Sequence, residues 1–74
     1  MSEERELDDY DAEFFKYLKA APLGRSMGDV VAFFIDPQEA RERVERYVAA
    51  GIARWTDQRT LVLTPAGKDW LSSR

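Results

Sequence analysis

The side chains of this chain that can do chemistry are carboxylates, cations and hydroxyls, because its 74 residues include no His and no Cys. These absences exclude disulfide frameworks, zinc fingers, thiol nucleophiles and imidazole general bases. The acids between Glu3 and Glu13 form a dense run and not a spaced catalytic pair. Gly24 and Gly28 lack the spacing and the lysine of a phosphate loop. We therefore expect no enzymatic activity, no cofactor and no bound metal.

Charge is unevenly distributed along the sequence. The net charge is −3, but residues 1–20 hold seven acids against three bases, a net −4, and residues 21–74 are close to neutral at +1. We expect residues 1–7 to form an acidic, flexible N-terminus and residues 8–74 to form a single domain. The longest apolar run, Val30–Ile35, is too short to span a membrane. The expected location is cytoplasmic, with no membrane partner.

Three helices are predicted in the first two thirds of the chain. The first begins at Asp8 or Asp9 and ends near Ala21, before Pro22. The second begins after Ser26, as a cap with an acid three residues later, and ends near Ile35. The third has the strongest start signal, because Asp36, Pro37 and Glu39 match a cap, a first-turn proline and a capping-box acid, and it runs to Ala50.

A β-hairpin and a fourth helix are predicted after Gly51. Residues Ile52–Trp55 and Thr60–Leu63 are short and rich in strand-forming residues, with a polar loop between them. Thr64 and Pro65 then start a helix that runs to about Ser72. A short strand at Leu23–Arg25 against the hairpin edge completes the expectation. The fold class is mainly α with a β-hairpin, in the order α-α-α-β-β-α.

This arrangement resembles a winged helix-turn-helix domain over residues 8–72. The run Leu63-Thr64-Pro65-Ala66-Gly67 is similar to the "leucine, threonine, x, x, glycine" end of the wing in MarR-like and PadR-like regulators. The resemblance implies a supporting helix at Ser26–Ile35, a recognition helix at Asp36–Ala50 and a wing tip at Thr56–Thr60. It implies binding to double-stranded DNA and a role in transcription regulation, with candidate contact residues Arg25, Gln38, Arg41, Glu42, Arg46, Arg54 and Arg59.

Composition favours two other interpretations of the same surfaces. The outward face of the third helix carries Glu42 and Glu45, and the pairs Glu39–Arg43, Glu42–Arg46 and Arg41–Glu45 have the spacing of a solvated, salt-bridged face. Off-stripe aromatic residues suggest a protein-interaction module on the same fold, as a homodimer or with another protein, through Phe15, Phe33 and Trp55. Phe15 and Phe33 would belong to the core instead if their helices are buried on two sides.

Overall fold

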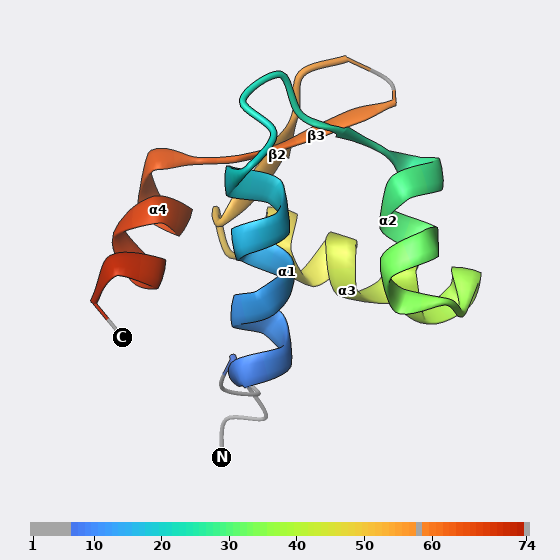
Figure 1. Cartoon of the computed structure of the whole chain (residues 1–74), viewed down its shortest axis with the longest axis horizontal. Coiled ribbons are helices and arrows are strands. Elements are labelled where there is room, and N and C mark those ends of the chain that lie inside the picture. Colours follow the sequence, from blue (N-terminus) through green and yellow to red (C-terminus); the bar gives the residue numbers. More distant parts are fainter. Residues whose placement is uncertain (1–6, 58, 74) are drawn as a thin grey trace.

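Four helices and a small antiparallel sheet make up the part of the chain that the computed structural model describes, residues 7–57 and 59–73 (Figure 1). The elements follow one another as α1 (Asp9–Lys19), β1 (Arg25–Ser26), α2 (Met27–Phe34), α3 (Pro37–Ala49), β2 (Ala53–Trp55), β3 (Thr60–Leu63) and α4 (Pro65–Ser72). The prediction of a mainly helical fold with a hairpin is confirmed. The predicted acidic N-terminus, except for Leu7, lies outside the described residues, and Leu7 packs against the core.

Every helix begins where a side chain caps its first turn. Each cap side chain accepts a backbone N–H two or three residues ahead, and such caps contribute about 1 kcal/mol each. Asp8 does so in a reciprocal capping box with Asp11, and the others are Ser26, Asp36 and Thr64. Prolines occupy the first helical position of α3 and α4, where no donor is needed. All four predicted helix starts are confirmed.

The sheet has the strand order β1-β3-β2, with all neighbours antiparallel. The short strand before α2 exists, but at Arg25–Ser26 and not at Leu23–Arg25. Gly24 has φ +97° and donates its N–H back to Ala21 at 2.8 Å, so this turn keeps Leu23 out of the ladder. The first helix ends at Lys19, earlier than predicted, because Ala20 is its C-cap and the Ala21 N–H donates to the Leu18 carbonyl three residues back, at 3.0 Å, so the last turn is tighter than an α-helical one.

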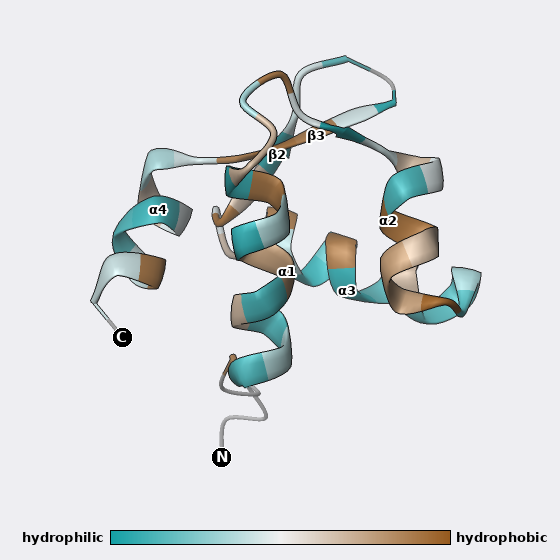
Figure 2. Ribbon diagram, in the orientation of Figure 1, coloured by the Kyte–Doolittle hydropathy of each residue, from teal (hydrophilic) through white to brown (hydrophobic). Residues whose placement is uncertain are grey.

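The core is an aromatic cluster centred on α1. Phe14 and Phe15 are both 0% exposed, and Tyr47 from α3 packs on both of their rings. In Figure 2 most of α3 lies at the hydrophilic end of the scale, whereas α2 is largely hydrophobic. The helix α3 therefore offers one stripe to the core and leaves most of the rest of its circumference polar.

Two of the three aromatic residues predicted as interface candidates are tied into this cluster. The prediction is wrong for Phe15, because α1 is buried on two sides and Trp70 of α4 covers this ring at 5.2 Å between centroids. Phe33 is half-buried and contacts the rings of Phe14 and Tyr17. Trp55 on β2 is 38% exposed and remains at the surface.

Candidate functional site

The exposed side of α3 carries most of the side chains singled out from the sequence. Ala40, Val44 and Tyr47 are buried. At about 100° per residue, the opposite side is centred on Glu42, with Arg41 at one margin and Arg46 at the other. Both arginines and Glu42 are exposed, as are Gln38 and Glu45. Gln38 Nε2 donates to Glu42 Oε2 at 3.4 Å, so these two polar groups lie together one turn apart.

The salt-bridged face predicted for α3 is formed at one pair of the three. Arg43 Nε lies 2.8 Å from Glu39 Oε2. Among the described residues, no ion pair joins Glu42 to Arg46 or Arg41 to Glu45. The prediction is wrong for those two pairs, since exposed pairs gain too little to fix two long side chains. The charges of Arg41 and Arg46 consequently have no carboxylate partner in the described part of the chain.

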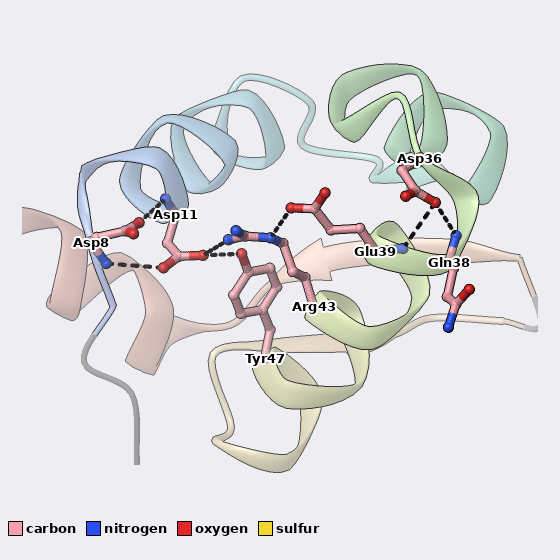
Figure 3. A network of polar contacts seen from close by, with 7 residues as sticks. All are labelled: Asp8, Asp11, Asp36, Gln38, Glu39, Arg43 and Tyr47. Carbon is pink, nitrogen blue, oxygen red and sulfur yellow. Dashed lines mark hydrogen bonds and ion pairs between the residues drawn. The ribbon is translucent and has the colours of Figure 1, made fainter. Parts of the chain in front are cut away.

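A buried polar network joins the start of α1 to the middle of α3 (Figure 3). Asp11 is only 4% exposed. Its Oδ1 accepts from Arg43 Nη1 at 2.8 Å and from the hydroxyl of Tyr47, while its Oδ2 accepts from the Asp8 N–H at 2.9 Å. Arg43 in turn reaches Glu39, as described above. Every oxygen of the buried carboxylate thus has a donor, as a charge removed from water requires.

Within this network the pKa values of Tyr47 and Arg43 are raised and that of Asp8 is lowered. Burial raises the pKa of Tyr47, and its hydrogen bond to Asp11 raises it further, so the phenol stays neutral and donates. Burial lowers the pKa of Arg43, but the hydrogen bonds of Tyr47 and Glu39 outweigh that and the pKa lies above its ordinary value. The pKa of Asp8 is lowered, first by the backbone hydrogen bond from Asp11. This network holds the inward side of α3, and therefore fixes which side of α3 faces out.

This network does not follow from the spacing of residues in the sequence. Asp11 was one acid in a dense run, and the spacing from Asp8 to Asp11 is the local signal that could have marked it as a capping-box residue. The contacts from Asp11 to Arg43 and Tyr47 bridge 32 and 36 residues. Contacts between residues so far apart in the sequence cannot be predicted from a local sequence pattern.

The side chain of Arg25 on β1 is directed to α1. Its Nε donates to the carbonyl of Tyr17 at 3.2 Å, and its guanidinium carbon lies 3.8 Å from the centre of the Tyr17 ring. The side chain is thereby held against the C-terminal part of α1.

The β2–β3 hairpin presents two further arginines. Arg54 on β2 and Arg59 in the loop are both exposed. The loop is organised by Asp57, whose carboxylate accepts the Arg59 N–H at 2.7 Å, and this backbone hydrogen bond is the main cause of the lowered pKa of Asp57. The Arg59 carbonyl accepts from the Met27 N–H at 3.2 Å, which ties the loop to the start of α2.

A groove of about 500 Å³ runs between α3, β2 and the start of α2. We call it the α3/β2 groove; it is lined by Met27, Arg41, Val44, Glu45, Val48, Ala49 and Trp55. Its lining is apolar except for Arg41 and Glu45. A second shallow hollow of about 460 Å³ lies along the first two turns of α3, beside Gln38 and Glu42. The structure thus brings together Gln38, Arg41, Glu42 and Trp55 on adjoining surfaces.

Within the described ranges, no group of three or more acidic side chains is placed to hold a metal ion. None of the helices in that part of the chain has the length and apolar character needed to cross a membrane. No family model, curated protein or solved structure matches this chain.

Proposed function

We propose that this domain is a winged helix-turn-helix module that binds double-stranded DNA. In this proposal α2 and α3 are the helix-turn-helix pair, α3 is the recognition helix, and the β2–β3 hairpin is the wing. The element order, the antiparallel sheet and the packing of α3 against β2 support it. Such domains place the exposed side of the recognition helix in the major groove, and the wing contacts the backbone or the minor groove.

The observation that carries the proposal is that four arginines are exposed and form no ion pair with a described residue. Arg41 and Arg46 lie at the two margins of the exposed side of α3, and Arg54 and Arg59 are exposed on the hairpin. None of the four forms an ion pair with a described residue. A cation without an internal partner is available to a phosphate, and phosphate neutralisation supplies essentially all of the sequence-independent affinity of DNA-binding proteins.

The same geometry gives the acidic residues of α3 a position that DNA tolerates. Arg41 and Arg46 at the margins would face the two phosphate backbones that border the major groove. Glu42, in the centre, would face base edges, where a carboxylate can accept from the amino group of cytosine and an amide such as Gln38 can pair with adenine. The net charge of −3 therefore weakens the electrostatic attraction but leaves groove binding open to this surface.

Salt dependence of binding to a mixed-sequence duplex tests the proposal. The full chain should bind at about 50 mM salt and lose affinity steeply towards about 200 mM. Each of Arg41→Ala, Arg46→Ala, Arg54→Ala and Arg59→Ala should weaken binding and lower the salt slope by about 0.9 for each lost phosphate contact. The matched control is Lys19→Ala, an exposed cation on α1, which should leave the slope unchanged.

Two outcomes would overturn the DNA proposal. One is the absence of measurable duplex binding at low salt. The other is an equal loss of affinity in Lys19→Ala and in the four arginine variants, which would indicate attraction by overall charge alone.

A further inference from the structure

Glu42 occupies the centre of the exposed side of α3, the side that would face base edges in the proposed DNA complex. It lines the shallow hollow of about 460 Å³ along the first two turns of this helix. Its carboxylate forms no ion pair with a described residue, and the one polar contact of the side chain in that part of the chain is Gln38 Nε2, at 3.4 Å. An ionised carboxylate accepts through two oxygens and donates nothing. Most of the acceptor capacity of Glu42 is therefore left for a group from outside the molecule.

The polar groups around Glu42 extend the same kind of surface. An amide beside a carboxylate must turn its NH₂ group to it, so the carbonyl oxygen of Gln38 lies on the side away from Glu42. Glu45 adds a second carboxylate to the lining of the hollow, whereas the cation Arg41 stands at its margin. The centre of this surface thus offers acceptors, and its complement in DNA is a hydrogen-bond donor.

Cytosine is the base whose major-groove edge suits a carboxylate best. The donors in that groove are the amino groups of cytosine and adenine, one for each base pair. The adenine amino group lies between two acceptors, adenine N7 and thymine O4, whereas the cytosine amino group has an acceptor on one side only. A carboxylate that meets only acceptors loses its water without gaining a donor, and a charge left uncompensated in this way is costly.

We propose that Glu42 makes duplex binding conditional on a cytosine under the second turn of α3. This inference rests on the proposed function and deepens it, because it names the class of duplex that the site selects. The four exposed arginines attract any duplex through its phosphates, and Glu42 penalises each register that places another base against it. A mixed-sequence duplex contains cytosine in many registers and therefore remains a ligand.

Three duplexes of equal length test the requirement without a known target sequence. One has mixed sequence, one contains only A·T pairs, and one repeats the mixed sequence with inosine in place of every guanine. Inosine–cytosine pairs keep the cytosine amino group in the major groove, but they lack the guanine N2 amino group in the minor groove, as A·T pairs do. The full chain should bind the mixed and inosine duplexes about equally, and the A·T duplex at least about tenfold more weakly.

The variant Glu42→Gln separates the carboxylate from other causes of such a preference. Glutamine has nearly the shape of glutamate, but it carries no charge and can pair with adenine. The preference for the inosine duplex over the A·T duplex should therefore fall to about twofold or less. A clash with the thymine methyl group would persist in this variant. The matched control is Glu13→Gln, at an exposed glutamate on α1, which should strengthen binding to all three duplexes by the same factor.

The outcomes that overturn this inference differ from those that overturn DNA binding. Equal affinity of the wild-type chain for the inosine and A·T duplexes excludes the cytosine requirement and retains DNA binding. A preference that persists in Glu42→Gln belongs to another residue, and a preference that inosine abolishes belongs to the minor groove; either result excludes the role of Glu42. No binding to any of the three duplexes excludes both proposals.

Discussion

Tyr47 on α3 donates its phenolic hydrogen to the carboxylate of Asp11 at the start of α1, across 36 residues of sequence. Arg43, one turn earlier on α3, donates to the same oxygen at 2.8 Å. Two donors from one helix therefore converge on one buried acceptor from another. This convergence fixes the rotation of α3 about its own axis, and with it the set of side chains that face outward.

Removal of the Tyr47 hydroxyl should destabilise the fold without emptying the core. In Tyr47→Phe, Asp11 keeps Arg43 but loses one donor, and a hydrogen bond to a charged group contributes about 1.5–3 kcal/mol. The matched control is Tyr17→Phe, because the Tyr17 hydroxyl has no hydrogen-bond partner among the described residues. We expect the control to change the free energy of unfolding by less than about 0.5 kcal/mol. Urea denaturation measures both, and equal losses would contradict the role of the hydroxyl.

The stability of the fold should decrease in alkaline solution through Tyr47. Burial, and then the hydrogen bond to Asp11, raises the pKa of this phenol in the folded chain. A tyrosine in the unfolded chain ionises near pH 10. The contribution of the neutral phenol is therefore fully present below about pH 10 and is lost as the pH rises through the higher folded pKa. The free energy of unfolding, measured from about pH 8 upward, should decrease in this range, and Tyr47→Phe should show a smaller decrease. An unchanged pH profile in the variant would assign the decrease to other groups.

Two helical glycines should respond in opposite directions to alanine. A Cβ on Gly67 would lie 2.4 Å from the Ile52 carbonyl oxygen and 2.7 Å from Leu63 Cδ1, which is too close for either atom. Gly67→Ala should destabilise the fold by about 1–3 kcal/mol. A Cβ on Gly28 would meet only Ser26 Oγ, at 3.6 Å, an ordinary contact. Gly28→Ala should stabilise by about 0.5–1 kcal/mol through helix propensity. Thermal unfolding measures the stability of both variants. If Gly67→Ala also stabilised the fold, the atoms around Gly67 would be able to move away from the new Cβ without loss of stability, which would contradict the prediction.

The turn between α2 and α3 should be stabilised by glycine. Ile35 has φ +75° and is 82% exposed, so a β-branched side chain adopts an unfavourable backbone conformation with almost no contact in return. Ile35→Gly should stabilise the fold by about 1 kcal/mol. Leu23→Gly is the control, because Leu23 is 90% exposed in a loop and does not have a positive φ. Glycine at this position relieves no strain and only raises the conformational entropy of the unfolded chain, which lowers the stability of the fold. Guanidinium denaturation should show a higher midpoint for Ile35→Gly alone, and a lower one would remove the strain argument.

Local signals accounted for the starts of the helices and for the hairpin. Asp36 and Thr64 cap within three residues of themselves, so the sequence contains the whole interaction. The strand predicted at Ile52–Trp55 begins one residue later, at Ala53, because the Ile52 N–H donates to the Tyr47 carbonyl at 2.9 Å and not to the ladder. Boundaries set by such contacts between elements do not follow from residue preference.

The candidate site was predictable where it is exposed and local, and not where it depends on distant partners. The exposure of Arg41, Glu42 and Arg46 follows from the stripe of Ala40 and Val44 on the opposite side of α3. The burial of Phe15 depends on Trp70, which arrives from the far end of the chain. Whether Arg25 faces solvent depended equally on the position of the Tyr17 ring. For Phe15 and Arg25, exposure is therefore decided by residues from other elements, which only the three-dimensional structure shows.

The capping box and buried carboxylate at the start of α1 divide the acid-rich segment into fixed and replaceable positions. Asp8 and Asp11 set the start of one helix and the rotation of another, whereas Glu13 forms an exposed ion pair with Lys16. Substitution among natural variants should be accepted at Glu13 and selected against at Asp11. The net charge of this molecule can therefore change over evolutionary time while the outward side of α3 keeps its orientation.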